Sequence, residues 1–353
     1  MAGESSMRVV PIGRAVWLQD DERDGVYLAA LVVTPEWACI TAGSWTRNPG
    51  GGARDRMWFC EFTATDDTGA SYKMGYNGAG TPQIQAGPFE LAPQPPADVR
   101  WLDVTPGPSR PAVRADLAAP TVPVQVTREE CSMAAAGLVL HRAATRMLAY
   151  WEPDRRIVNS QLEGFGATVA ALAEAGGLPA DSPLPGQLAA LCEQLGVTGH
   201  GITAAPRHDL PESWRSVAAY HLGENPGAGT HAASAPVAVV LPELDGVRYA
   251  VAGLHTGYGQ TWLHVLAYGT VAGGIDPRAA TSWWLRDDTG QWHVAVVTAE
   301  GENYRQLLVV PPVTPGSTAL DLVVAGQAAR ARAQLPLTWW SPPGGSGTGM
   351  PRR

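Results

Sequence analysis

The sequence predicts a mainly β fold with a helical insert, in which two β-sandwiches are related by internal duplication. Three observations support this fold class. Short apolar runs separated by turn residues fill both ends of the chain, the same motifs recur in the same order in the two ends, and the stretch between them has a helical period. The chain has 353 residues, of which 45% are hydrophobic, so it has enough apolar material for more than one packed core.

Four repeated motifs define the two copies. They are Asp-Gly-Val at 24–26 and 245–247, Asp-Asp-Thr-Gly at 66–69 and 287–290, Leu-Asp-Val or Leu-Asp-Leu at 102–104 and 320–322, and x-Arg-Ala-x-Leu at 113–117 and 331–335. The first two pairs are offset by 221 residues and the last two by 218. Because the order is kept, residues from about 7 to 120 and from about 235 to 340 are predicted to form the same module.

Each copy contains short strands interrupted by turn residues. In the first copy, strands are predicted at 26–33, 58–65, 70–74, 101–105 and 112–117. In the second copy, they are predicted at 248–254, 283–285, 291–298, 319–324 and 329–335. Asp-Gly and Pro-Gly-Pro sequences supply the turns between them. About seven such strands in each copy, with no helical period, predict an immunoglobulin-like sandwich.

Between the copies, the apolar period becomes that of a helix. Thr127 and Glu130 have the spacing of a capping box, and three or four amphipathic helices are expected after it. Large apolar residues such as Phe165 are expected to dock on the sandwiches and to fix the two modules in one orientation. The predicted domains are an N-terminal sandwich (1–125), a helical segment (126–230), a C-terminal sandwich (231–340) and a disordered Gly/Pro/Ser-rich tail (341–353).

The order of these motifs resembles a known group of modules. Trp-Trp before Asp-Asp-x-Gly, then Pro-Pro, then Leu-Asp-Val or Leu-Asp-Leu, and then an Arg-x-x-Leu strand are similar to the immunoglobulin-like modules of uncharacterised actinobacterial proteins. The resemblance covers both sandwiches, about two-thirds of the chain. It implies the fold, and because its motifs are turn signatures it implies no activity and no functional residue.

Composition excludes several classes of function. The net charge is −8 and the only lysine is Lys73, so an acidic chain without a basic stripe is not expected to bind nucleic acid. No apolar run is long enough to span a membrane, and the N-terminus lacks the apolar stretch of a signal peptide. The four cysteines have no metal-ligand spacing and are expected to be reduced, which predicts a cytoplasmic protein without a metal or cofactor.

Two groups of residues are candidate sites. The acidic turns at Asp66, Asp67, Asp287 and Asp288 carry either hairpin-turn residues or, as the alternative, oxygen ligands for calcium. Trp339 and Trp340 follow the last predicted strand and are candidates for an interaction surface, because large aromatic side chains anchor many interfaces.

No catalytic residue is predicted. The eight histidines form no metal-binding motif, and the chain has neither a nucleophile elbow nor a catalytic-cysteine signature. The predicted function is that of a non-catalytic, intracellular protein-interaction or scaffolding protein whose partner is a protein. Two alternatives stay open: a ligand-binding module, possibly for carbohydrate, that uses Trp-lined sandwich faces, and a hydrolase of unrecognised type with a site between the domains.

Overall fold

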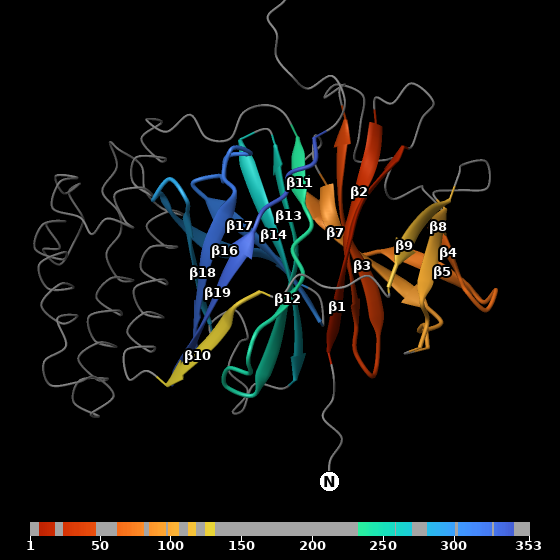
Figure 1. Cartoon of the computed structure of the whole chain (residues 1–353), viewed down its shortest axis with the longest axis horizontal. Coiled ribbons are helices and arrows are strands. Elements are labelled where there is room, and N and C mark those ends of the chain that lie inside the picture. Colours follow the sequence, from red (N-terminus) through yellow and green to blue (C-terminus); the bar gives the residue numbers. More distant parts are fainter. Residues whose placement is uncertain are drawn as a thin grey trace, which may run out of the picture.

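The computed structural model describes about half of the chain, and these parts are β structure (Figure 1). The described residues are 7–17, 24–46, 62–80, 85–96, 98–105, 112–117, 124–130, 232–257, 259–269, 281–300, 303–326 and 328–341. Within them, no helix is long and apolar enough to cross a membrane. The strands form two sheets, and the mainly β fold predicted from the sequence is confirmed.

The first sheet contains the N-terminal strands. They are β1 (Arg8–Trp17), β2 (Asp24–Val33), β3 (Ala38–Thr46), β4 (Phe62–Asp66), β5 (Ser71–Tyr76), β6 (Ala79–Gly80), β7 (Gln85–Ala92), β8 (Trp101–Thr105) and β9 (Val113–Asp116). Their hydrogen-bonded order is β1-β2-β3-β7-β5-β4-β8-β9, and β6 pairs with β7. In the described part of this sheet, every pair of neighbouring strands is antiparallel. We call this sheet the N-module.

The second sheet, here called the C-module, contains β10 and all later strands. They are β10 (Val126–Glu130), β11 (Ala233–Ala235), β12 (Val239–Val240), β13 (Val247–Gly257), β14 (Gln260–Gly269), β15 (Ser282–Asp287), β16 (Trp292–Glu300), β17 (Tyr304–Val310), β18 (Ala319–Ala325) and β19 (Ala329–Pro336). The order is β10-β19-β18-β15-β16-β17-β14-β13-β11, with β12 paired to β13.

The two modules share one strand order. Read from β1, the N-module path β1-β2-β3-β7-β5-β4-β8-β9 corresponds position by position to β11-β13-β14-β17-β16-β15-β18-β19 in the C-module. In each module the pairing is continuous from end to end. An immunoglobulin sandwich divides its strands between two separate sheets, so the pairing of neither module shows the division that the sequence led us to expect.

The register shows that the fourth repeated motif was aligned two residues out of place. Leu102 lies opposite Ala115, and its counterpart Leu320 lies opposite Leu335. The structural counterpart of Leu335 is therefore Ala115, and the alignment of Leu335 with Leu117 was wrong. A shift of two residues leaves the same side chains facing the core, so the alternation along the strand is the same in both alignments.

The predicted capping box at Thr127 is part of a strand. Residues 126–130 form β10, which pairs antiparallel with β19, and Thr127 lies opposite Arg332. Arg330 Nη2 also lies 2.8 Å from Glu129 Oε2 across this pair. The helical segment predicted to start at residue 126 therefore starts too early, because cross-strand pairing outweighs a local capping pattern. Residues 131–231, where the other predicted helices fall, lie outside the described residues, as does the tail from 342.

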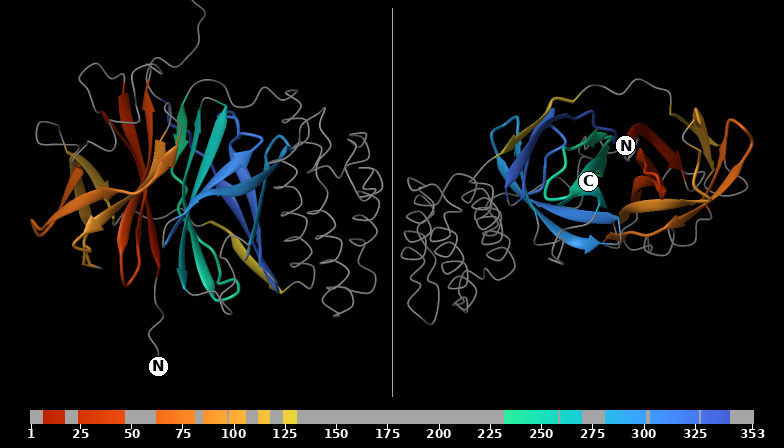
Figure 2. Two further views of the ribbon diagram at one scale, coloured as in Figure 1. Left: turned by 180° about the vertical axis from the view of Figure 1, so that it is seen from behind. Right: turned by 90° about the horizontal axis from the view of Figure 1, so that it is seen from below.

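Each sheet curls around a core of its own (Figure 2). The N-module core takes buried side chains from β1 through β9, among them Leu28, Phe62, Phe89 and Leu102. The C-module core is built in the same way, around Trp283, which is 1% exposed. Along β8 every second side chain is buried, namely Leu102 and Val104. This is the period expected of a strand with one face on a core.

The two modules also pack directly on each other, in a β-sandwich-like arrangement (Figures 1 and 2). The outer faces of β2 and β3 lie against the outer faces of β13 and β14, and a second apolar cluster joins them, including Ala30, Val32, Ala252 and Leu266. This explains the composition of β2 and β13. Their apolar runs do not alternate because one face fills the core of the module and the other fills the contact between modules.

Candidate functional site

The acidic turns are hydrogen-bonded in the same way in both modules. Asp66 Oδ1 accepts bonds from the backbone N–H of Thr68 (2.8 Å), the Thr68 hydroxyl (2.7 Å) and the backbone N–H of Ala70 (2.9 Å). Asp287 Oδ1 accepts the equivalent three bonds from Thr289 and Gln291, at 3.0, 2.6 and 2.9 Å. The carboxylates therefore close hairpin turns, as Asp residues do in many proteins.

The second carboxylate of each turn also binds backbone. Asp67 Oδ1 accepts a bond from the N–H of Arg100 at 3.1 Å, and Asp288 Oδ2 accepts one from the N–H of Thr318 at 2.8 Å. Each carboxylate thus ties its turn to the start of the neighbouring strand in the sheet, β8 in the N-module and β18 in the C-module. In the described part of the chain, no group of three or more His, Cys, Asp or Glu residues is arranged to hold a metal ion.

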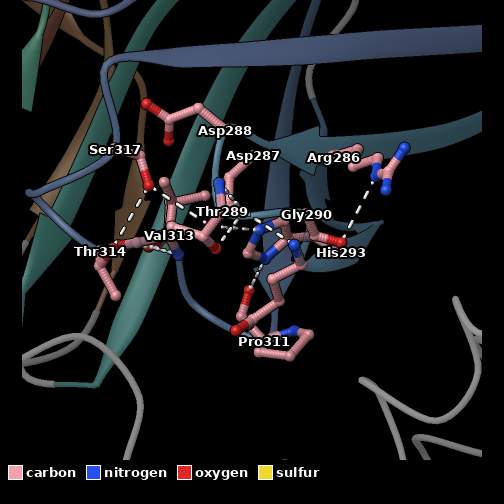
Figure 3. Close-up of polar contacts among 12 residues, drawn as sticks. Arg286, Asp287, Asp288, Thr289, Gly290, His293, Pro311, Val313, Thr314 and Ser317 are labelled. Carbon is pink, nitrogen blue, oxygen red and sulfur yellow. Dashed lines mark hydrogen bonds and ion pairs between the residues drawn. The ribbon is translucent and has the colours of Figure 1, made fainter.

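In the C-module the turn brings an aspartate, a histidine and a serine together (Figure 3). His293 Nε2 lies 3.6 Å from Asp287 Oδ2, and the Ser317 hydroxyl donates to the same oxygen at 3.4 Å. His293 Nδ1 lies 2.7 Å from the carbonyl oxygen of Pro311. Because a carbonyl only accepts, Nδ1 carries a proton there and is not available as a base.

This trio is not arranged for nucleophilic catalysis. A catalytic serine donates to histidine, whereas Ser317 donates to the aspartate, and both His293 and Ser317 are 0% exposed. Burial alone would raise the pKa of Asp287, but His293 beside the carboxylate and the bonds from Thr289 and Gln291 outweigh it and lower the pKa to about 2. The cluster holds a charged carboxylate in a fixed turn, which is a structural task.

An open groove lies where the two modules meet. It has a volume of about 410 Å³ and is lined by Glu36, Trp37 and Glu90 of the N-module and by Asn303 and Tyr304 of the C-module, with others. A volume of this size suits a small ligand or a side chain of a partner protein. Most of the lining belongs to the N-module, and the C-module closes one side of the groove, so the groove has this shape only while the modules are docked.

One wall of the groove is the turn that joins β2 to β3. The Thr34 hydroxyl accepts bonds from the backbone N–H groups of Glu36 (3.3 Å) and Trp37 (3.1 Å), and Gln94 Nε2 donates to the Thr34 carbonyl at 2.5 Å. Thr-Pro at the start of this segment is typical of such a turn, because proline fixes the backbone angle of its second residue. Trp37 is half-buried, and Glu36 is exposed.

The charged side chains that line the groove are carboxylates. They are Glu36 and Glu90, and the amide of Asn77 donates to Glu90 Oε1 at 3.4 Å. Cys39 lies at the base of the groove and is buried, and no disulfide joins it. Burial and then the charge of Glu90 raise the pKa of the Cys39 thiol well above its usual value, so it stays protonated and is a poor nucleophile.

Beneath the groove, two histidines of the C-module lie buried against the N-module. His264 Nδ1 is 2.8 Å from the hydroxyl of Tyr304, the residue that also lines the groove. His255 Nδ1 is 2.7 Å from the hydroxyl of Ser234, and the two imidazole rings meet edge to face with centroids 4.7 Å apart. Within the described residues, neither Nε2 has a hydrogen-bond partner.

Trp339 and Trp340 lie half-buried at the end of the C-module. Trp339 Nε1 donates to the Ser317 carbonyl at 2.7 Å. The Trp340 ring packs on two N-module rings, Tyr27 with a centroid separation of 5.2 Å and Trp45 with one of 4.6 Å. Trp340 is therefore part of the contact between the modules.

The residues of the groove and of the histidine pair were not found by sequence reasoning. His255 and His264 lie on adjacent strands, and their hydroxyl partners are distant in sequence, so no spacing motif marks them. The signal available for the groove was Trp37, a large aromatic residue placed directly after a Thr-Pro turn between two predicted strands. An aromatic residue in such a position suggests a contact, but it does not say with what.

Comparison with known proteins adds no family. No protein-family model matches the chain, and no curated protein matches it. A solved structure described as the conserved domain protein from Bacillus anthracis aligns with 90% of this chain and 77% of its own, at 6% sequence identity and a TM-score of 0.20. That likeness is too low to support an argument about fold or function.

Proposed function

We propose that this protein is a non-catalytic binding protein, built from two copies of one β-module, which receives a protein partner in the groove where the modules meet. The observation that carries the proposal is the groove itself, about 410 Å³ in volume and lined by both modules. The shared strand order and the matching acidic turns support the derivation of the two modules from one ancestor by duplication.

The chemistry of the groove favours a basic group on the partner. Glu36 and Glu90 supply two carboxylates and Trp37 supplies an aromatic ring, and among the described residues that line the groove there is no lysine or arginine. A lysine or arginine side chain would find a charge partner and an aromatic surface there. A protein segment that carries such a side chain is therefore the partner class that the groove suits best.

The non-catalytic part of the proposal is supported by the state of the groups that might react. His293 and Ser317 are fully buried in the acidic turn, His255 and His264 are fully buried between the modules, and the Cys39 thiol is held protonated. A nucleophile or general base must reach its substrate, and in the described residues none of these groups is placed to do so.

A peptide-display selection tests the proposed function. Random peptides would be selected on the full-length protein and then compared for binding to the Glu36→Gln/Glu90→Gln variant, which keeps the shape and polarity of the groove but removes its charge. Asp321→Asn is the matched control, because Asp321 is an exposed carboxylate on β18, outside the groove.

The proposal predicts enrichment of peptides with lysine or arginine, at least tenfold weaker binding to the double variant, and unchanged binding to Asp321→Asn. Tenfold corresponds to about 1.4 kcal/mol, a modest loss for two charge partners. Peptides that bind the wild type and the Glu36→Gln/Glu90→Gln variant equally, or a selection that enriches nothing, would contradict the proposal.

A further inference from the structure

The contact between the modules has a polar centre that is flanked by apolar clusters. One cluster lies around Ala30 and Ala252 and another around Tyr27 and Trp45. Between them lie His255 and His264, both 0% exposed, and Thr41, whose hydroxyl donates to the Ala252 carbonyl of the other module. Two imidazoles are thus enclosed in the contact surface along which the two modules would separate.

The N-module is shaped to accept one of these rings. A Cβ placed on Gly43 of β3 would lie 2.2 Å from His255 Nδ1, so only glycine allows the ring to sit where it does. On the other side, the backbone of Gly253 has a φ of +138°, and a Cβ there would lie 2.7 Å from that of Ala29. Close packing on both sides leaves His255 no room to move towards water without the faces parting.

We propose that His255 and His264 make the docking of the two modules, and with it the groove, sensitive to acid, so that protonation of the imidazoles separates the faces and disassembles the groove. The inference rests on the proposed function only in so far as the groove is the binding site. Tyr304 links the two, because its ring lines the groove and its hydroxyl is bonded to His264.

Among the residues that the structure describes, no negative charge near the pair compensates a protonated imidazole. The titratable groups that face it are Tyr27 from β2 and Tyr304 from β17, with Cys39 and Tyr76 acting on Tyr304. Burial raises the pKa of all four, so they stay neutral in acid. In the described residues, no carboxylate bonds to either imidazole, and Arg14, which acts on Tyr27, carries the wrong charge to help.

The direction of the effect follows from burial. Desolvation lowers the pKa of His255 to about 3 and, together with the charge of His255, lowers that of His264 well below its usual value. Separated modules would return both groups to an ordinary pKa of about 6.5. Docking therefore has its full strength above pH 6.5 and weakens as the pH falls towards about 3, about tenfold per pH unit through His255, and His264 acts in the same direction.

The distance between the modules reports docking without any ligand. Spin labels attached through non-natural amino acids at Thr63 on β4 and Asp321 on β18, both exposed, would be measured by pulsed electron resonance across the pH range, and circular dichroism would follow the β structure. We expect one narrow distance at neutral pH that broadens between pH 6.5 and about 3 while the β signal persists.

A matched pair of variants assigns the change. His255→Asn/His264→Asn keeps a hydrogen-bonding group near each Nδ1 but cannot be protonated, so it should stay docked at least one pH unit lower than the wild type. His293→Tyr removes a buried histidine that lies outside the interface and should leave the transition in place. A transition that is abolished by His293→Tyr, or is unchanged in the double variant, overturns the proposal.

If the double variant does not fold, the wild type still decides the matter. Nitrogen-15 spectra of labelled histidine distinguish neutral from charged imidazole, and they should show both rings neutral until the pH at which the distance broadens. Rings that become charged while the distance stays narrow would overturn the proposal. Because no peptide is present, failure of the peptide selection and failure of this test are separate results.

Discussion

The two modules hold equivalent carboxylates, Asp66 and Asp287, in equivalent turns but give them different partners. Tyr72 donates its hydroxyl to Asp66 Oδ2 in the N-module, whereas His293 and Ser317 face Asp287 Oδ2 in the C-module. Tyr72 and His293 occupy corresponding places, six residues after the aspartate. In both turns a polar ring on the neighbouring strand faces the second carboxylate oxygen, a phenol in the N-module and an imidazole in the C-module.

The same contrast holds at the contact between the modules. The C-module supplies two histidines, and Gly43 of the N-module leaves the space that the His255 ring fills. One module thus contributes polar rings and the other contributes the space for them. The two modules therefore contact each other closely through side chains in which they differ.

The largest expected effect is loss of the buried carboxylate in the C-module. Asp287→Ala should lower the free energy of unfolding by about 3–5 kcal/mol, because it leaves the buried His293 without the carboxylate and two part-buried backbone N–H groups without their acceptor. Asp66→Ala should cost less, because the hydroxyl left behind is neutral. Chemical denaturation of the two variants measures this, and equal losses would break the comparison.

Next in size is the contact with His255. Gly43→Ala should destabilise the protein by about 1–3 kcal/mol, because a Cβ at this position meets the ring at 2.2 Å. Gly75→Ala is the control: a Cβ there has nothing within 4 Å, and the change should be close to neutral. Thermal unfolding of both variants checks the prediction, and a neutral Gly43→Ala would show that His255 is not tightly held.

A swap between the turns sharpens the comparison further. His293→Tyr gives the C-module the partner that the N-module uses, so stability should change by less than about 1.5 kcal/mol. His293→Leu supplies no donor and should cost about 1–3 kcal/mol. If both variants lose the same amount in urea denaturation, the donor on the neighbouring strand does not matter and the two turns are alike only in shape.

The smallest effect is a shared dependence on acid. The bonds from Tyr72 and Thr68 lower the pKa of Asp66 from 3.8 to about 2, and the pKa of Asp287 is also about 2. Since both values lie below that of the unfolded chain, these carboxylates stabilise the protein fully above pH 3.8, and the contribution is lost as the pH falls through about 2. Unfolding free energies of the wild type and of Asp66→Asn, measured between pH 5 and pH 2, should converge at the acid end.

The strands could be predicted because their signals are local. The apolar runs of β2 and β13, the turns at Asp66 and Asp287 and the shared shift between them all lie within short windows of sequence. The Thr127 capping pattern failed for the opposite reason, because a partner strand more than 200 residues away decided its conformation.

The docking of the modules and the groove could not be predicted. An apolar run such as residues 26–33 fits equally a strand buried under helices and a strand buried under another sheet, and only the three-dimensional arrangement distinguishes them. Trp340 was identified as an interaction candidate, but the surface that it covers proves to be the N-module of the same chain. Spacing in sequence cannot say whether an aromatic side chain meets a partner or its own molecule.

The central claim is that the two modules are docked face to face and so create one groove. The direct measurement is the distance distribution between labels at Thr63 and Asp321 in the full-length chain at neutral pH. Rigid docking through β2, β3, β13 and β14 predicts a single narrow distribution that matches the structure. A broad distribution, of the kind given by two modules that tumble independently, would contradict it.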